Sequence, residues 1–189
     1  MKKIVIYPAK MLRSVTPIIE VVDSKLVDDV AELEKILKNS DNGAGLAATQ
    51  IDLNRRFFGL KDTKTKKVEV FINPEIEAVF GEKTYPMIKV EGKKDENFLE
   101  GCLSFPDYYG TVKRFLKIKV SWQELREGKL TKKSKELAGF EAIVFQHERD
   151  HLNGIVFVDR VGEEGGKFYK VVGEEMMVWD VGKVLRGEL

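Results

Sequence analysis

The chain has 189 residues, 43% of them hydrophobic, which is enough to form one compact domain with its own core. Its 32 Lys and Arg against 31 Asp and Glu leave a formal charge of +1, so it lacks the basic excess that nucleic-acid-binding domains concentrate on one face. The single cysteine excludes an intrachain disulfide and favours a reducing compartment, and no apolar run suits a signal peptide or a membrane span. We therefore expect a cytoplasmic protein without membrane or direct nucleic-acid binding.

The first regular element that the sequence predicts is a helix over residues 25–38, with Ser24 as its N-cap. Its apolar residues recur at spacings of four, three and four, which is the periodicity of one helix face. These residues are Leu26, Val30, Leu33 and Leu37. Residues 39–45 are expected to end the helix.

Strands and turns are expected in the middle of the chain. In chain order, the sequence predicts strands over 57–60, 68–72 and 85–90, followed by an exposed charged loop over 91–97. A half-buried strand follows, with alternate apolar residues at Leu116, Ile118 and Val120. A turn is predicted at 127–129. The second of these strands is expected to end at Asn73-Pro74, since this pair is typical of a strand end.

A second helix is predicted over residues 134–152, with Asn153-Gly154 as its C-terminal stop. One face of it carries Leu137, Phe140, Val144, His147 and His151. The final 27 residues fit strand or helix equally. We expect one α+β domain over 1–189, with small antiparallel or mixed sheets packed around a central helix that carries the two histidines.

The sequence H-E-x-x-H, formed by His147, Glu148 and His151, points to a metal. Residues four apart share a helix face, so both imidazoles can bind one ion, and Glu148 can reach a water molecule bound to it. The alternative is two unrelated core histidines. However, the chain has only two His, and uncompensated imidazoles on a buried helix face would be costly. The pattern therefore favours a metal site.

A third ligand is needed, and two candidates are available. Cys102 is the only cysteine, and although a lone Cys is most often a small buried hydrophobe, a thiolate suits zinc or ferrous iron. One Cys with two His leaves the fourth position open, as a catalytic site requires. The competing ligand is Glu174 or Glu175, which lie far enough beyond His151 to follow the plan of many metallopeptidases.

Residues 43–50, with the sequence G-A-G-L-A-A-T-Q, fit the loose dinucleotide pattern G-x-G-x-x-[G/A]. That pattern must follow a strand and open a helix, whereas here it follows a predicted helix. A glycine-rich turn is one alternative. The other is that Gly43 and Gly45 let the backbone approach an extended peptide, with Gln50 offering its amide to a carbonyl oxygen.

Three segments, 43–50, 100–104 and 147–151, together resemble the peptide deformylase family, whose motifs are G-x-G-L-A-A-x-Q, E-G-C-L-S and H-E-x-D-H in that order. The resemblance covers about residues 5–160, and 161–189 is left as a C-terminal extension. It implies a hydrolase that removes the formyl group from the N-terminal formyl-methionine of newly made polypeptides. Fe²⁺ is the metal it implies, with Zn²⁺, Ni²⁺ or Co²⁺ as substitutes. N-formylmethionyl peptides are the expected partners, and the ribosome is a candidate transient one.

The resemblance implies roles for the metal-binding residues, and these roles agree with the metal site expected from the H-E-x-x-H spacing and Cys102. Cys102, His147 and His151 would be the ligands, and metal-bound water would be the nucleophile. Glu148 would act as general base when hydroxide attacks the formyl carbon, and then as general acid toward the departing amine.

The resemblance also implies roles around the metal. The Gln50 side-chain amide and the Leu103 backbone N–H would meet the developing oxyanion together with the metal. Ile143 and Val144, with Leu103, would line a pocket for the methionine side chain, although all three also fit a purely structural core role.

The resemblance also implies one ion pair behind the metal ligands, and this sequence departs from the family pattern in two places. Asp150 is expected to pair with Arg114. Tyr109 stands where an arginine that helps hold the substrate backbone is common, and the stretch 80–98 is longer than in many relatives.

Overall fold

The computed structural model describes residues 2–88 and 96–188. Its strands form two antiparallel sheets and one short strand pair, and helices pack against them. The strands are β1 (Gly45–Ala47), β2 (Phe57–Lys61), β3 (Val68–Phe80), β4 (Met87–Ile88), β5 (Glu96–Asn97), β6 (Glu100–Cys102), β7 (Phe105–Gly110), β8 (Lys117–Arg126), β9 (Lys129–Ala138), β10 (Phe168–Val172) and β11 (Glu175–Val178). The helices are η1 (Lys10–Arg13), α1 (Ser24–Asn39), η2 (Ala48–Ile51), α2 (Phe140–Leu152), α3 (Phe157–Glu164) and α4 (Val181–Leu185). The predicted α+β class is confirmed.

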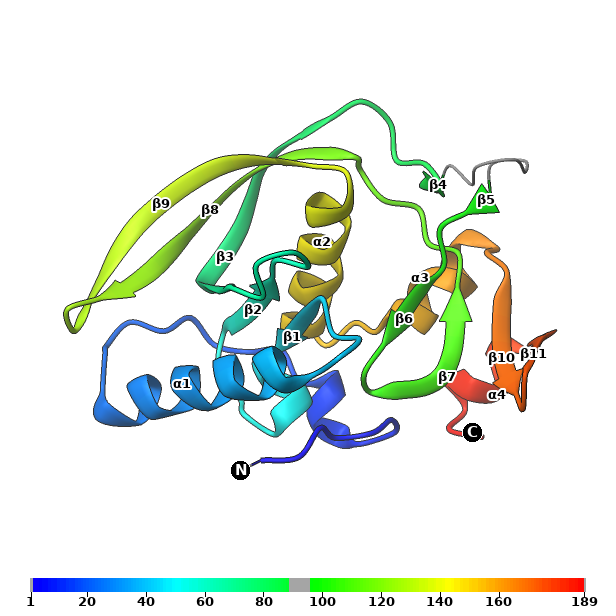
Figure 1. Cartoon of the computed structure of the whole chain (residues 1–189), viewed down its shortest axis with the longest axis horizontal. Helices are drawn as coiled ribbons and strands as arrows, with labels where there is room; N and C mark the ends of the chain where they lie inside the picture. The colour runs from blue at the N-terminus through cyan, green and yellow to red at the C-terminus, as the bar shows by residue number, and fades with distance from the viewer. Residues whose placement is uncertain (1, 89–95, 189) are drawn as a thin grey trace.

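The larger sheet has the strand order β1-β2-β3-β8-β9, and the second sheet has the order β11-β10-β7-β6. Figure 1 shows the long β8–β9 hairpin arching over α1, with α2 between that sheet and the strands β6 and β7. Helix α2 contacts β1, β2 and β9. This arrangement brings β6, which carries the only cysteine, to the helix that carries both histidines.

The first predicted helix is observed as α1, but its cap differs from the prediction. Asp23 is the N-cap, and its side chain accepts a hydrogen bond from the Leu26 N–H at 2.6 Å. Ser24 is the first helical residue. A carboxylate at this position also interacts favourably with the positive end of the helix, which explains why Asp23 takes the cap.

The strand predicted over 68–72 does not end at Asn73-Pro74 but continues as β3 to Phe80. Asn73 has a φ of 49°, and the register with β8 shifts between Ile72 and Glu75, so the proline sits at a bulge. The Asn73 side chain ties this bulge to the N-terminal segment, because it accepts from Ile19 N at 2.9 Å and donates to Ile19 O at 2.8 Å. The prediction was therefore wrong about where the strand ends.

The second predicted helix begins six residues later than expected, at Phe140. Residues 134–138 belong to β9, and Leu137 is buried from that strand, opposite Ile118 of β8. Gly139 separates the two elements with φ 58° and ψ −131°, a conformation that only glycine adopts readily. The predicted stop is observed, since Asn153 is the C-cap and Gly154 has a φ of 71°.

The other strand predictions are confirmed in part. The strand over 57–60 is β2, and the turn at 127–129 joins β8 to β9 with positive φ at Glu127 and Gly128. Leu116 lies just outside β8 and is 43% exposed, whereas Ile118 and Val120 are buried as predicted. Within the strand predicted over 85–90, Met87–Ile88 form β4, and within the loop predicted over 91–97, Glu96–Asn97 form β5. Residues 89–95 lie outside the described residues.

The last part of the chain, for which the sequence predicted no definite element, contains β10, β11 and α4. Strand β10 pairs with β7, and β7 pairs with β6. An apolar cluster that includes Tyr7, Phe105, Phe157, Phe168 and Val184 joins this region to the N-terminal segment. The C-terminal segment therefore completes the sheet that holds the cysteine.

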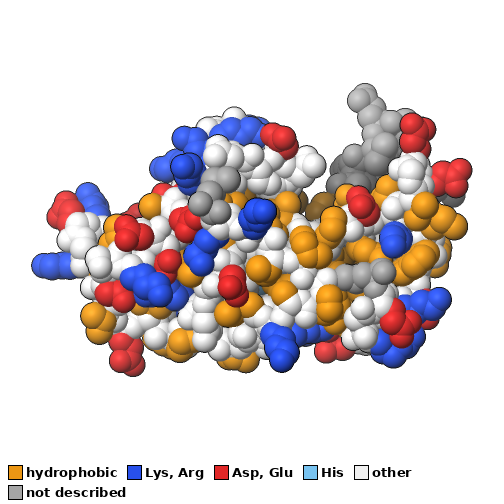
Figure 2. Space-filling view, turned by 90° about the horizontal axis from the view of Figure 1, so that it is seen from below, with side chains coloured by type: hydrophobic (Ala, Val, Ile, Leu, Met, Phe, Trp, Pro, Cys, Tyr) orange, Lys and Arg blue, Asp and Glu red, His pale blue; other side chains and the backbone are white. Residues whose placement is uncertain are grey.

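Charged side chains of both signs are interspersed on the face seen in Figure 2, with hydrophobic side chains between them. This distribution agrees with the near-zero net charge and gives no single-sign surface there. None of the helices in the described ranges combines the length and apolar character that a membrane span needs.

Candidate metal centre

Three side chains with metal-binding atoms converge where β6 meets α2. Cys102 ends β6, and His147 and His151 project from one face of α2. Their ligand atoms all lie within 4.8 Å of one another, and the Cys102 Sγ is 3.2 Å from His151 Nε2. The competing residues Glu174 and Glu175 are exposed at the β10–β11 turn and are not part of this cluster. Within the described residues, the geometry thus favours the cysteine over either glutamate.

His147 is oriented by a buried carboxylate. Its Nδ1 lies 2.9 Å from Glu100 Oε2, which leaves Nε2 free to face the cluster. Burial would lower the pKa of His147, but hydrogen bonds to Cys102 and Glu100 outweigh it and raise the pKa well above its ordinary value. A bound metal would take the place of the proton on Nε2, because an imidazole ligates in its neutral form.

Glu100 is itself held by arginine. Arg114 binds it through two parallel hydrogen bonds, Nε to Oε1 at 2.7 Å and Nη2 to Oε2 at 2.9 Å. Burial would raise the pKa of Glu100, but the Arg114 charge and its hydrogen bonds lower it to about 2. The carboxylate therefore stays ionised and can accept a hydrogen bond from His147.

Asp150 and Arg160 extend this charge network. Arg114 Nη1 lies 2.6 Å from Asp150 Oδ2, which confirms the predicted pair. Arg160 of α3 also binds Asp150, with Nη2 2.8 Å from Oδ1. Two residues of this charge network were not predicted from the sequence. Glu100 opens the E-G-C-L-S motif, and Arg160 has no signal in the sequence.

Glu148 lies beside the cluster and is buried, with 3% of its surface exposed. Its Oε2 has no hydrogen-bond partner among the described residues. Burial, followed by the nearby Glu100 charge, raises the pKa of Glu148 to about 7. Gly45 packs directly against it, because a Cβ at position 45 would lie only 2.7 Å from Glu148 Cγ. The glycine thus makes room for a carboxyl group whose free oxygen needs a partner.

Gln50 is also buried next to the cluster. Its Oε1 accepts a hydrogen bond from the Ala47 N–H at 2.8 Å, which fixes the orientation of the amide. Its Nε2 donates to Cys102 Sγ at 3.3 Å and to Ser104 Oγ at 3.2 Å. The Gln50 N–H groups therefore point toward the cysteine side of the site. Residues 43–50 follow α1 and form β1 and η2, which excludes the strand-turn-helix context of a dinucleotide fingerprint.

A cavity of about 420 Å³ opens onto the cluster. Nearly all of the site residues named from the sequence line it, with the fully buried His151 behind. The lining includes Gly43, Gly45, Gln50, Cys102, Leu103, Ile143, Val144, His147 and Glu148. Tyr109 lines it as well, and its ring packs on Gly101, where a Cβ would lie 2.9 Å from Tyr109 Cε1. Phe98 and Phe140, whose rings meet edge to face, also line it. Neither was predicted as a site residue, although Phe140 was placed on the helix face of the histidines.

The residues present fit a divalent cation. A thiolate and two imidazoles are ligands that zinc and ferrous iron accept, and three protein ligands leave a position for water or substrate. Burial, with the neighbouring His147 charge, lowers the pKa of His151 well below its ordinary value, so this imidazole is neutral and available as a ligand.

Comparisons with known proteins show which family this chain resembles. The polypeptide deformylase family profile matches residues 1–166. The peptide deformylase of Chromobacterium violaceum is 38% identical over 159 residues, which cover 83% of this chain and 84% of that protein. The peptide deformylase of Rhodopirellula baltica is 39% identical over 165 residues, covering 86% and 74%.

Solved structures show the same relationship. The crystal structure of peptide deformylase from Thermotoga maritima superposes with a TM-score of 0.70 and 32% identity, covering 85% of this chain and 97% of that one. The peptide deformylase from Legionella pneumophila gives a TM-score of 0.67 and 31% identity, covering 85% of each chain. Sequence and fold therefore agree, and the chain belongs to the peptide deformylase family of enzymes.

Proposed function

We propose that this enzyme removes the formyl group from the N-terminal formyl-methionine of newly made polypeptides in the cytoplasm. The observation that carries the proposal is the convergence of Cys102, His147 and His151 beside the buried carboxyl of Glu148, in a chain of the deformylase family. A transient contact with the ribosome remains a prediction.

Cys102, His147 and His151 would hold the metal, for which we propose Fe²⁺. A divalent cation at this position would supply Lewis-acid chemistry, making a water molecule more acidic and polarising the formyl oxygen. Glu100 keeps the His147 ring turned toward the site through the 2.9 Å contact at Nδ1. Zn²⁺, Ni²⁺ or Co²⁺ would suit the same ligands.

Glu148 is proposed as the group that moves protons. Its carboxylate accepts a proton from the water that attacks the formyl carbon, and delivers it to the amine as the C–N bond breaks. Two observations support this role: its Oε2 has no hydrogen-bond partner within 2–88 and 96–188, and burial raises its pKa to about 7. A proton carrier works best when its pKa lies near the working pH. Gly45 supports it by leaving room for this carboxyl group.

Gln50 and Leu103 are proposed to stabilise the oxyanion that forms as water adds. The Gln50 amide is already fixed by the Ala47 N–H, so it loses little freedom when it donates to the developing charge. Leu103 directly follows Cys102 and lines the same cavity, which supports a donor role for its backbone N–H.

Ile143 and Val144 are proposed to receive the methionine side chain, next to Leu103 in the cavity wall. Gly43 and Gly45 line the same cavity, and we propose that their backbone contacts the substrate peptide. Tyr109 stands in this wall without a cationic group, so it can position a peptide by ring contact but not by charge.

Turnover of formyl-Met-Ala-Ser by anaerobically purified, Fe²⁺-loaded protein tests the proposal. We expect release of formate and a free methionine amine, with no cleavage of the Met–Ala bond. The same assay with formyl-free, internally cleavable peptides tests the metallopeptidase alternative. Cleavage of those peptides without formate release would contradict the proposed function.

A further inference from the structure

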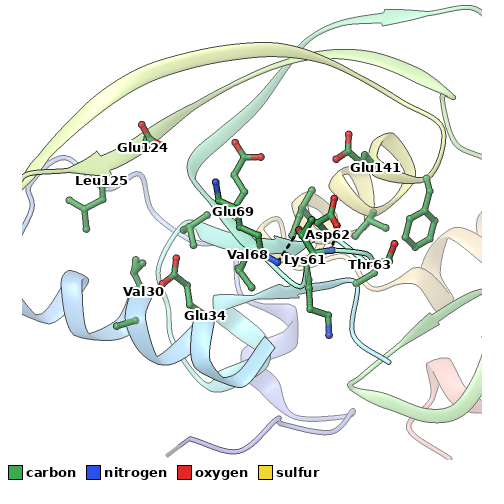
Figure 3. Close-up of a pocket in the computed structure, with 18 of the residues that line it drawn as sticks. Val30, Glu34, Lys61, Asp62, Thr63, Val68, Glu69, Glu124, Leu125 and Glu141 are labelled. Atoms are coloured by element: carbon green, nitrogen blue, oxygen red, sulfur yellow. Dashed lines mark hydrogen bonds between the residues drawn. The ribbon is translucent and has the colours of Figure 1, made fainter. Parts of the chain in front are cut away.

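A second cavity, of about 650 Å³, lies next to the catalytic one and takes no part in the roles described above. It lies between α1 and the sheet strands β2, β3 and β8, and reaches the first turn of α2 (Figure 3). We call it the lateral trough. Ala44, Phe140 and Val144 line both the trough and the catalytic cavity, so the two adjoin at these residues.

Part of the lining of the trough is apolar. Val27 and Val30 of α1 face it, and Val68 and Leu125 line it from the sheet. Val27 is 45% exposed, as is Phe140 at the boundary with the catalytic cavity. Apolar side chains left open in a concave site of this volume are typical of a ligand-binding groove.

The trough also carries more acidic than basic side chains. Its carboxylates are Glu34, Asp62, Glu69, Glu124 and Glu141, and its cationic side chains are Lys61 and Lys67. Lys61 keeps its positive charge, and its Nζ donates to the backbone carbonyls of Leu37 and Ser40. With five carboxylates against two lysines, the lining of the trough has a net negative charge beside its apolar side chains.

Three of these carboxylates form no ion pair in the described part of the chain: Glu34, Asp62 and Glu141. Glu69 pairs with Lys135 at 2.7 Å and Glu124 with Lys133 at 3.5 Å. Asp62 instead accepts hydrogen bonds from the backbone N–H groups of Lys64 and Thr65. Figure 3 shows Glu34 on α1 and Glu141 on α2, at opposite sides of the trough. Partial burial raises the pKa of Glu34, as expected for a carboxylate with no cation nearby.

We propose that the lateral trough binds the stretch of the formylated polypeptide that follows the residues held in the catalytic cavity, and that it prefers apolar residues alternating with Lys or Arg. The inference rests on the proposed function. An unfolded polypeptide that enters the catalytic cavity by its first residue must leave over an adjoining surface, and the trough shares a wall with that cavity. Apolar side chains would pack on the valines, and cationic ones would meet Glu34 and Glu141.

Three synthetic substrates test the proposal on the metal-loaded enzyme: formyl-Met-Ala-Ser, formyl-Met-Ala-Ser-Lys-Val-Lys-Val and formyl-Met-Ala-Ser-Glu-Val-Glu-Val. At low salt we expect kcat/KM to be about three- to tenfold higher for the Lys peptide than for the Glu peptide, mainly through KM. The difference should vanish near 1 M salt, where charges are screened beyond about 3 Å.

The double variant Glu34→Gln/Glu141→Gln should lose this preference while its kinetics on the tripeptide stay unchanged. Glu20→Gln/Glu82→Gln is the matched control, since it removes two exposed carboxylates that line neither cavity. Melting temperatures of both variants report any loss of fold.

Three outcomes would count against the proposal. Equal rates for the two longer peptides would overturn it and leave the trough to another occupant, such as a separate basic protein or a second copy of the chain. A Lys preference that survives in Glu34→Gln/Glu141→Gln would place the basic segment elsewhere and overturn it too. Failure to turn over even the tripeptide would overturn the proposed function, and this inference with it.

Discussion

The Gln50 side-chain amide donates a hydrogen bond to the Cys102 sulfur across 3.3 Å, which joins the glycine-rich segment to the candidate metal centre. Its orientation is fixed from the other side by the Ala47 N–H at 2.8 Å. A donor held in this way can act on charge that develops beside the cysteine, and the first prediction tests that role.

Gln50→Ala is expected to lower kcat by about 10²–10³-fold with little change in KM, because an oxyanion donor acts mainly in the transition state. Gln50→Glu is the matched variant. It keeps an oxygen for the Ala47 N–H but loses the donor, so its kcat should be at least as low. Steady-state kinetics on formyl-Met-Ala-Ser, with metal content and melting temperature, measure both. A variant with normal kcat per folded molecule would show that Gln50 is structural.

Glu148→Gln is expected to keep its metal and its affinity for peptide while kcat falls by at least about 10²–10⁴-fold, because both proton transfers depend on the carboxylate. Glutamine fills almost the same volume beside Gly45, so the fold should be maintained. Metal analysis and kinetics on the purified variant check this. Loss of the metal from Glu148→Gln would indicate that this residue is a ligand.

The raised pKa of Glu148 predicts how the stability of the metal-free protein depends on pH. Burial raises this pKa from 4.5 to about 7, so the folded protein holds the proton more strongly than the unfolded chain. The contribution of protonated Glu148 to the stability of the folded protein is complete below about pH 4.5 and is lost as the pH rises through about 7. Urea unfolding of metal-free wild type and Glu148→Gln at pH 5, 6, 7 and 8 should give a stability difference that changes across this window. A constant difference would contradict the assigned pKa.

Replacement of each of the two arginines that bind Asp150 should lower the free energy of unfolding by very different amounts. Arg114 is buried and binds both Glu100 and Asp150, so Arg114→Leu leaves the buried Glu100 carboxylate without an arginine, removes one of the two arginines on Asp150, and should cost about 3–5 kcal/mol. Arg160 is partly exposed at 24%, and Arg160→Leu should cost about 1 kcal/mol or less. Urea unfolding of both variants measures this. Equal costs would mean that Arg114 is not the principal partner.

The sequence was most informative where function depends on local spacing. His147 and His151 lie four apart on a helix, so their common face followed from periodicity alone, and the Arg114–Asp150 pair followed from the family resemblance. The convergence of Cys102 with the histidines depends on pairing between distant segments, which motifs could suggest but spacing could not derive. Their role as ligands remains a prediction.

The errors have physical causes. Leu137 fits a period of 2 as well as a period of 3.6, so the residues before Gly139 were assigned to a helix although they pair with β8. Strand β3 continues past Pro74 because the Asn73 side chain supplies hydrogen bonds that the sequence does not reveal. Glu100 was not foreseen as the partner of His147, since the two are 47 positions apart.

The most direct test of the central claim is formate release from formyl-Met-Ala-Ser as a function of Fe²⁺ bound per chain, for wild type and Cys102→Ala under anaerobic conditions. Cys102 supplies one of the three converging ligand atoms, so its loss should weaken metal binding or abolish turnover. We expect wild-type turnover to rise in proportion to bound metal and to saturate at about one ion per chain, with Cys102→Ala inactive. Full metal content and full turnover in Cys102→Ala, with both lost in Glu174→Ala/Glu175→Ala, would contradict the account.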